Sequence, residues 1–352
     1  MKQLSLLNDD LDPAERALGS RTARGIEPAR QDAELVALAA GLNGRLRLGT
    51  SSWSFPGWSG LVYAHLAPKQ SLSRDGLAAY ARHPLLRSVG VDSGFYAPLD
   101  AGRLARYADQ VPAGFRFLVK APASITDPVQ RVASSGSRAA NPGFLDPALA
   151  LQQAVDPYLK GLGDKAGVLL FQFPPLGRAW TEQPRRFAED LYRFLRQLPC
   201  GPAYAVELRD PELLTPDLAA ALHHGGAVPG LAGHPRLPPI GTQQDLFADY
   251  DEGPLVIRWL LRRNRRYGEA RDRYQPFDRL CEPDPETRTC IAALVRAALA
   301  RGREVYVIAN NKAEGSSPLT LIELARALAQ DERHRRRLDT DSRPIDPVPK
   351  TD

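Results

Sequence analysis

The sequence lacks the features that define several common classes of protein. No stretch approaches the roughly 18 uncharged apolar residues that a membrane-spanning helix needs, and the opening residues MKQLSLLNDDLDPAER turn acidic before an apolar signal region can form. The three cysteines, Cys200, Cys281 and Cys290, are odd in number and have no C-x-x-C spacing, which argues against a disulfide framework. We therefore expect a cytoplasmic protein with no membrane association.

Motifs for phosphate binding and for nucleophilic catalysis are also missing. The patterns G-x-x-x-x-G-K-S/T and G-x-G-x-x-G do not occur, and neither does the G-x-S-x-G turn that exposes a catalytic serine. Of the six histidines, only His234 lies near the end of a predicted strand, whereas catalytic zinc sites are rich in histidine. We expect no metal and no cofactor, and keep a metal site formed by Asp92, Glu207 and His234 as the alternative.

What the sequence does contain is a regular alternation of two kinds of segment. Short runs rich in β-branched and aromatic residues alternate with longer amphipathic segments, as in repeated βα units. We predict strands at 45–51, 87–93, 115–120, 167–173, 203–209, 226–231, 255–260 and 304–310. We predict helices at 77–82, 101–110, 147–162, 182–198, 216–223, 285–301 and 319–330. Eight strands in this alternation favour an α/β fold, a single (β/α)8 TIM-like barrel, over a doubly wound sheet.

Three regions follow from this pattern. Residues 1–44 form a partly helical N-terminal extension with one short helix at 32–42, and residues 45–329 form the barrel. Residues 330–352 are too charged and too rich in proline to bury a core, so we expect a disordered tail. Within the barrel, 126–146 and 262–285 are expected to be long loops, the run 226–231 is interrupted by Pro229, and 235–251 shows no clear helical periodicity.

The last polar residues of the strands form the candidate site, because the active sites of such barrels lie at the carboxyl ends of the strands. Side chains alternate along a strand, so the parity of each run selects the residues that share the mouth of the barrel. They are Asp92, Lys120, Gln172, Glu207, Arg209, Arg258 and Asn310. This mixture suits a small polar or anionic ligand, with Glu207 as general base and Lys120 as acid or electrostatic clamp. The alternative is a buried network of salt bridges that closes the barrel.

Aromatic and basic residues lie near the same ends of the strands. Trp53 and Tyr96 follow the first two strands, where their rings either contact a ligand or pack the loops. The segment RRNRRYGEARDRY at 262–274 carries a net charge of +4 with two tyrosines interleaved. Such a loop fits phosphate or single-stranded nucleic acid, or is a solvated charged loop.

Seven ordered motifs carry a resemblance to a known family. They are GTSSWSFPGW at Gly49–Trp58, FY at Phe95–Tyr96, FRFLVKAPASIT at Phe115–Thr126, QFPP at Gln172–Pro175, ELR at Glu207–Arg209, Arg258 in VIRW, and NN at Asn310–Asn311. With these motifs the chain resembles the YecE-like family (domain of unknown function 72), a group of bacterial and archaeal proteins. The resemblance implies a TIM barrel and adds Asn311 to the site, but it implies no established reaction.

The chain departs from the family pattern where chemistry is expected. Gly90, Asp92 and Gly94 stand where the family pattern has glutamate, asparagine and threonine. Other polar positions of the pattern are occupied here by Asp127, Asp210, Gly233 and Leu260. The residues that remain suit ligand binding better than a relay of several proton-transferring groups.

Three functions remain open from the sequence. The first is an enzyme that uses hydrolase-type or lyase-type acid–base chemistry on a phosphorylated or carboxylated compound similar to a sugar or nucleotide. The second is a non-catalytic ligand-binding or scaffold protein, and the third is a protein that binds or processes nucleic acid. The sequence does not decide the reaction class or the oligomeric state, because one fold supports unrelated functions.

Overall fold

Eight parallel strands close into a barrel in this computed structural model, which describes residues 25–131, 137–250 and 252–341. Their order around the barrel is β1-β10-β9-β8-β7-β6-β3-β2. Their bounds are β1 Leu46–Thr50, β2 Leu86–Val91, β3 Arg116–Lys120, β6 Ala166–Gln172, β7 Tyr204–Glu207, β8 Ala227–Gly233, β9 Leu255–Trp259 and β10 Val305–Ala309. The predicted (β/α)8 barrel is therefore confirmed.

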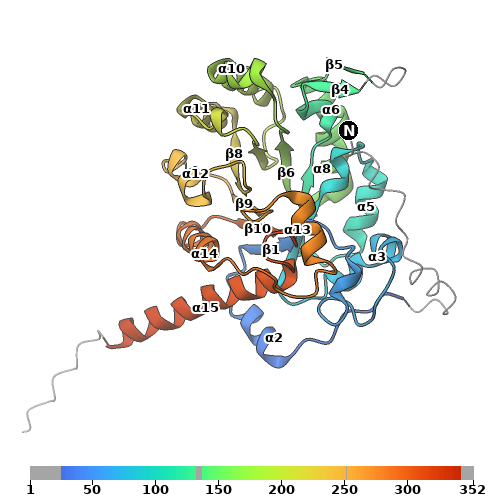
Figure 1. Ribbon diagram of the computed structural model, residues 1–352, viewed down its shortest axis with the longest axis vertical. Helices are drawn as coiled ribbons and strands as arrows, with labels where there is room; N and C mark the ends of the chain where they lie inside the picture. Colours follow the sequence, from blue (N-terminus) through green and yellow to red (C-terminus); the bar gives the residue numbers. More distant parts are fainter. Residues whose placement is uncertain (1–24, 132–136, 251, 342–352) are drawn as a thin grey trace, which may run out of the picture.

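Helices surround the strands, and Figure 1 shows α10, α11, α12 and α14 on the outside of the barrel. Their bounds are α2 Ala33–Ala40, α3 Lys69–Asp75, α4 Leu77–Tyr80, α5 Ala101–Asp109, α6 Ala123–Thr126, α7 Pro147–Ala150, α8 Asp156–Leu162, α9 Arg178–Thr181, α10 Pro184–Leu195, α11 Pro216–Gly225, α12 Ile240–Leu246, α13 Tyr267–Tyr274, α14 Pro285–Ala300 and α15 Ser317–Asp341. Short 3-10 turns are η1 Pro56–Trp58, η2 Asp92–Phe95, η4 Gly163–Lys165 and η5 Pro211–Leu213, and the π turn η3 Leu151–Val155 joins α7 to α8.

Many helix starts are encoded locally by the residue that precedes them. Asp100, Thr215 and Asp284 each accept a hydrogen bond from a backbone N–H in the first turn of α5, α11 and α14. Such caps satisfy donors that have no partner inside the helix. Proline opens α11 and α14, where its missing N–H costs nothing. These signals explain why the predicted helix starts agree with the structure.

Three segments without predicted secondary structure contain helices or strands. The expected loop at 126–146 contains an antiparallel pair, β4 (Val129–Arg131) and β5 (Arg138–Ala140), and the expected loop at 262–285 contains α13. The segment 235–251, where no helix was predicted, contains the short helix α12.

The last helix α15 continues to Asp341, beyond the end predicted for it at 330. Residues 1–24 of the predicted extension and 342–352 of the predicted tail lie outside the described residues. None of the helices in the described part of the chain is long and apolar enough to cross a membrane.

Pro229 does not interrupt the barrel. It pairs in register with Val206 of β7, and pairing with β9 begins one residue later, at Gly230. Proline removes one donor from the ladder, and the remaining bonds of β8 keep the strand in place. All residues of β7, β9 and β10 are buried, as expected for strands covered on both faces. The polar residues at their ends are therefore held by rigid elements.

Candidate functional site

Four charged side chains meet at the carboxyl ends of β2, β7 and β9. Arg258 Nη2 donates to both carboxylate oxygens of Asp92, at 2.9 Å each, and Arg258 Nη1 lies 3.5 Å from Glu207 Oε1. Arg209, two residues after Glu207, forms an ion pair with the same oxygen. Asp92, Glu207, Arg209 and Arg258 are called the charged cluster below. Because charges are almost never fully buried unless they are paired, this pairing explains how Arg258 and Glu207 can be 2% and 0% exposed.

Glu207 retains unused hydrogen-bonding capacity inside this cluster. Neither of its carboxylate oxygens accepts a hydrogen bond of ordinary geometry from a residue that the structure describes. The two guanidinium groups are close but poorly aligned, and leaving a buried acceptor without a hydrogen bond costs about 1–3 kcal/mol. Buried polar groups of this kind are rare in folded proteins. Oε1 of Glu207 is therefore held by ion pairs with the two guanidinium groups, and Oε2 has no partner among the described residues.

Lys120, at the end of β3, lies beside the charged cluster. Its Nζ is 3.8 Å from the centroid of the Phe95 ring, and it forms no ion pair with any described carboxylate. Burial lowers the pKa of Lys120 to about 8, although Asp92 and Glu207 raise it. An amine with this pKa is mostly protonated at neutral pH, and it loses its proton when the pH rises slightly above neutral.

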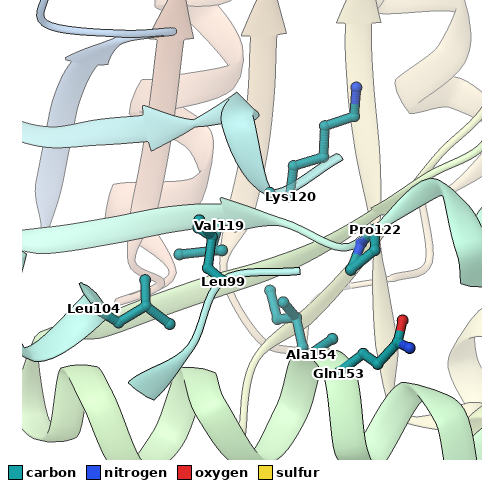
Figure 2. A pocket seen from close by; sticks show the side chains of 9 residues that line it. Leu99, Leu104, Val119, Lys120, Pro122, Gln153 and Ala154 are labelled. Carbon is teal, nitrogen blue, oxygen red and sulfur yellow. The ribbon is translucent and has the colours of Figure 1, made fainter. Parts of the chain in front are cut away.

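Lys120 also lines a small apolar cavity between β3 and the helices outside it. Figure 2 shows the amine pointing away from this cavity, whose lining includes Leu99, Leu104 and Val119. The cavity volume is about 10 Å³, close to the minimum for a single water molecule. It is a packing gap, and the polar end of Lys120 belongs to the mouth.

A second lysine at the mouth, Lys312, was missed by the sequence prediction. It is 5% exposed, and its Nζ lies 4.2 Å from the centroid of the Tyr267 ring and 3.5 Å from Asn310 Oδ1. Burial and then Arg271 lower the pKa of Lys312 to about 8, against the opposing effect of Asp92. The site residues were predicted from the alternation of side chains along strands, and this rule does not reach Lys312 because it lies in the turn after β10. The neighbouring pair Asn310–Asn311 was the sequence signal that could have pointed to this turn.

Two tyrosines stand at the rim of the mouth. Tyr96 is 73% exposed and Tyr267 is 55% exposed. Partial burial of the hydroxyl, followed by repulsion from Tyr267 and Asp92, raises the pKa of Tyr96. Burial and Asp92 also act on Tyr267 in the same direction. Tyr96 directly follows η2, which carries Asp92, and Tyr267 is the first residue of α13.

The basic segment 262–274 is organised around one carboxylate, Glu282. Arg265 Nη2 lies 2.6 Å from Glu282, Arg273 Nε lies 3.0 Å from it, and Tyr274 donates a hydrogen bond to it. The hydrogen bonds from Arg265, followed by that from Tyr274, lower the pKa of Glu282 to about 2, against its desolvation. Much of the positive charge of this segment is therefore used to hold α13 against the barrel.

A larger pocket lies beyond the ends of β8 and β9. Its volume is about 550 Å³, and it lies between α12 and α14 with Gly233, His234, Trp259 and Arg263 in its lining. Burial, followed by Arg209, lowers the pKa of His234 to about 4, while Glu207 acts in the opposite direction. His234 is therefore a neutral imidazole at physiological pH, and it lines this pocket.

Comparisons with known proteins identify the family. The description "Protein of unknown function DUF72" matches residues 47–344. The chain belongs to the DUF72 family. A crystal structure of a DUF72 family protein from Enterococcus faecalis V583 has a TM-score of 0.55 at 18% identity, over 87% of this chain and 99% of that one. A DUF72 family protein from Thermotoga maritima MSB8 has a TM-score of 0.54 at 23% identity, over 81% and 99%. None of the curated proteins matches the chain.

Some residues of the DUF72 resemblance have packing roles. Trp53 is buried, donates its indole N–H to the Leu72 carbonyl, and packs edge-on against Tyr107. Asn311 Oδ1 accepts hydrogen bonds from Trp58 and Ser317 and so holds the turn after β10. The structure therefore does not bring Trp53 and Asn311 to the mouth as free ligand-binding groups.

Gln172 and Asn310 lie closer to the charged cluster. Gln172 is buried at the end of β6, where it pairs in register with Glu207. Asn310 accepts from the backbone N–H of Lys312 at 3.0 Å and thereby fixes the turn that carries this lysine. Both remain candidates for contact with a ligand.

The departures from the DUF72 pattern have local structural reasons. A Cβ atom at Gly94 would lie 2.6 Å from the carbonyl oxygen of Lys120, so the η2 turn here leaves no room for a threonine. Asp127 accepts from the backbone N–H of Val129, and Asp210 accepts from that of Leu176 at 2.6 Å. These two aspartates stabilise loops.

A metal site at Asp92, Glu207 and His234 does not form in this geometry. In the described part of the chain, no group of three or more His, Cys, Asp or Glu side chains is arranged to hold a metal ion. Arg258 forms ion pairs with both Asp92 and Glu207, so a guanidinium group occupies the position between the two carboxylates where a metal ion would be expected. The mouth is instead a cationic site, with four basic groups and two carboxylates and a net charge of +2.

Proposed function

We propose that the mouth of this DUF72 barrel binds a small anionic compound, phosphorylated or carboxylated, and transforms it by acid–base chemistry. The observation that carries the proposal is Glu207, a fully buried carboxylate with unused acceptor capacity, next to lysines without an ion-pair partner among the described residues. Buried polar groups without a well-formed hydrogen bond cost stability, and proteins retain them mainly at functional sites.

In this proposal the basic groups bind the anion and two residues move protons. Lys120, Arg209 and Arg258 bind the negative group, since ammonium and guanidinium donors suit phosphate and carboxylate. Glu207 accepts a proton from the bound compound. The ammonium group of Lys120 donates a proton to the oxygen on which negative charge develops, and its pKa of about 8 suits this role near neutral pH.

A thermal-shift screen of phosphorylated and carboxylated metabolites tests the binding step. A ligand that binds only the folded state raises the melting temperature, and Lys120→Met should abolish that rise. Lys160→Met is the matched control, because Lys160 lies on the exposed face of α8 in an ion pair with Asp156. If no anion raises the melting temperature, or if Lys120→Met responds like Lys160→Met, the binding proposal is wrong.

Turnover of a compound identified in this way tests the chemical step. Loss of turnover in Glu207→Gln with binding retained supports the acid–base role of Glu207. Binding without turnover in the unmodified protein would instead indicate a non-catalytic ligand-binding protein.

A further inference from the structure

The turn η2 contacts two basic residues of the mouth and gives each a different partner. Its first residue, Asp92, accepts hydrogen bonds from Arg258 at both carboxylate oxygens, at 2.9 Å each. Its last residue, Phe95, has its ring centroid 3.8 Å from the ammonium nitrogen of Lys120, well inside the limit of about 6 Å for a cation–π interaction. Lys120 forms no ion pair with a carboxylate of the described residues. The arginine is therefore held by a carboxylate and the lysine by a ring.

The backbone fixes this ring relative to the lysine. The turn packs directly on the end of β3, because a Cβ atom at Gly94 would lie only 2.6 Å from the carbonyl oxygen of Lys120. Phe95 is half-buried, and the ring of Tyr96 packs edge-on against it, with centroids 5.5 Å apart. Aromatic pairs prefer such an edge-to-face arrangement. The ring of Phe95 is therefore held both by the turn and by its neighbour.

A ring and a carboxylate beside Lys120 would affect an incoming anion differently. A carboxylate would neutralise the ammonium group and repel the anion, whereas the face of an aromatic ring attracts the ammonium group and carries no net charge. Burial disfavours the charged form of Lys120 and lowers its pKa to about 8. The ring of Phe95 opposes this effect, because it stabilises the charged form without taking up its charge.

We propose that Phe95 is a positioning residue for the anion site, whose ring holds the ammonium group of Lys120 at the mouth and keeps it charged. This inference rests on the proposed function, which assigns anion binding to Lys120. It requires an aromatic ring at position 95, and an apolar side chain without a ring does not replace it.

Titration of the lysine side chains by NMR spectroscopy tests the contact itself. The chain has only seven lysines, so Lys120→Met identifies the signal of Lys120. We expect this signal to titrate near pH 8 in the natural chain and at lower pH in Phe95→Leu, with a proton affinity reduced about tenfold by the loss of the cation–π interaction. Phe95→Tyr retains a ring and should restore the natural value.

Phe144→Leu is the matched control for the loss of a ring. Phe144 is also half-buried and packs against Trp180, but no lysine or arginine of the described residues lies over its ring. It should leave the titration of Lys120 unchanged. The other charged groups that act on Lys120 are present in all of these variants; they are Asp92, Glu207, Arg209 and Arg258.

Calorimetric titration with sulfate tests the consequence for anion binding. Sulfate keeps the same charge at neutral and mildly alkaline pH, so changes in its affinity report on the protein. We expect Phe95→Leu to bind sulfate about fivefold more weakly than the natural chain at pH 8, because most of Lys120 is then deprotonated. When Lys120→Met is already present, Phe95→Leu should have no further effect, since the ring then has no ammonium group to hold.

The outcomes distinguish this inference from the proposed function. Melting curves confirm that each variant folds, and Phe95→Met is used if Phe95→Leu does not. If Lys120 titrates at the same pH with and without the ring, or if Phe95→Leu weakens sulfate binding equally in the presence and absence of Lys120, the inference is wrong and the anion site stands. If Lys120→Met binds sulfate as tightly as the natural chain, the proposed function fails, and with it the role of Phe95 in anion binding.

Discussion

Arg258 and Asp92 form an ion pair across the mouth in which one guanidinium nitrogen donates to both carboxylate oxygens at 2.9 Å. The side chain of Arg258 is 2% exposed and that of Asp92 is 35% exposed. The arginine is therefore held inside the barrel, and the carboxylate is the more exposed partner. In the anion site that we propose, Asp92 would compete with the ligand for this guanidinium group.

Replacement of this competing charge should strengthen anion binding. In Asp92→Asn the net charge of the mouth rises by one, and we expect the Kd for inorganic phosphate to fall about five- to tenfold, equivalent to ~1 kcal/mol. Asp109→Asn, at the exposed end of α5, is the control and should leave the Kd unchanged. Titration calorimetry at pH 7 measures both. An unchanged or higher Kd in Asp92→Asn would show that Arg258 does not bind the anion.

Glu207→Gln should lower stability strongly. The change leaves the guanidinium groups of Arg209 and Arg258 with one carboxylate fewer, and breaking a buried ion pair typically costs about 3–5 kcal/mol. Glu304→Gln removes a half-exposed partner of Arg47 and should cost less than about 1 kcal/mol. Urea unfolding of both variants measures the difference. Equal losses would mean that Glu207 is not the central ion-pair partner.

Lys312→Met should have the opposite effect on stability. Burial lowers the pKa of Lys312 from 10.5 to about 8, so its charged form is disfavoured in the folded protein. Below pH 8 this burial costs folding free energy, and the cost disappears as the pH rises from about 8 to 10.5, because the folded protein loses this proton before the unfolded chain does.

We therefore expect Lys312→Met to raise the free energy of unfolding at pH 7 by about 1–3 kcal/mol. The gain should shrink toward pH 10.5, and unfolding curves across this range measure it. The Lys160→Met control should show no such pH dependence. A variant less stable than the natural chain at pH 7 would show that Lys312 is a structural residue.

Glu282→Gln should loosen α13 and remove the pH dependence that Glu282 gives to the stability of the basic segment. The lowered pKa of Glu282 contributes stability above its ordinary value of 4.5, and this contribution is lost as the pH falls toward about 2. We expect a loss of about 1–2 kcal/mol at pH 7, because the surrounding arginines are partly exposed to solvent. The difference between variant and natural chain should vanish near pH 2. Glu212→Gln, at an exposed position in η5, is the control.

Gly94→Ala should displace the turn that carries Asp92 and Phe95. The added methyl group would lie 2.6 Å from the Lys120 carbonyl oxygen, which requires a movement of the backbone. Overpacking of this kind costs about 1–3 kcal/mol, and phosphate affinity should fall together with the melting temperature. Ser93→Ala, at the exposed neighbour, should alter neither property. Normal stability and affinity in Gly94→Ala would show that the turn adapts without moving the lysine.

The repeating elements of this fold could be predicted from its sequence. The eight strands follow from short β-branched runs, and the helix starts follow from caps such as Asp100 and Thr215, because both signals depend on neighbours within a few residues. Alternation within strands also placed Glu207 and Arg258 on the same side of the barrel wall. The short helix α12 was missed because packing on β8 and α14, and not a periodic apolar stripe, stabilises it.

The sequence by itself determined the barrel and which side chains end its strands, since these depend on local pattern and parity. Only the tertiary structure decided which charges meet. Asp92 and Arg258 are 166 residues apart in the chain, and Lys312 reaches the mouth from a turn to which no strand parity applies. The arginines of the basic segment are likewise bound by Glu282, whose position depends on the packing of α13. Electrostatic interactions depend on distance in space and on burial, and both are set when the barrel closes.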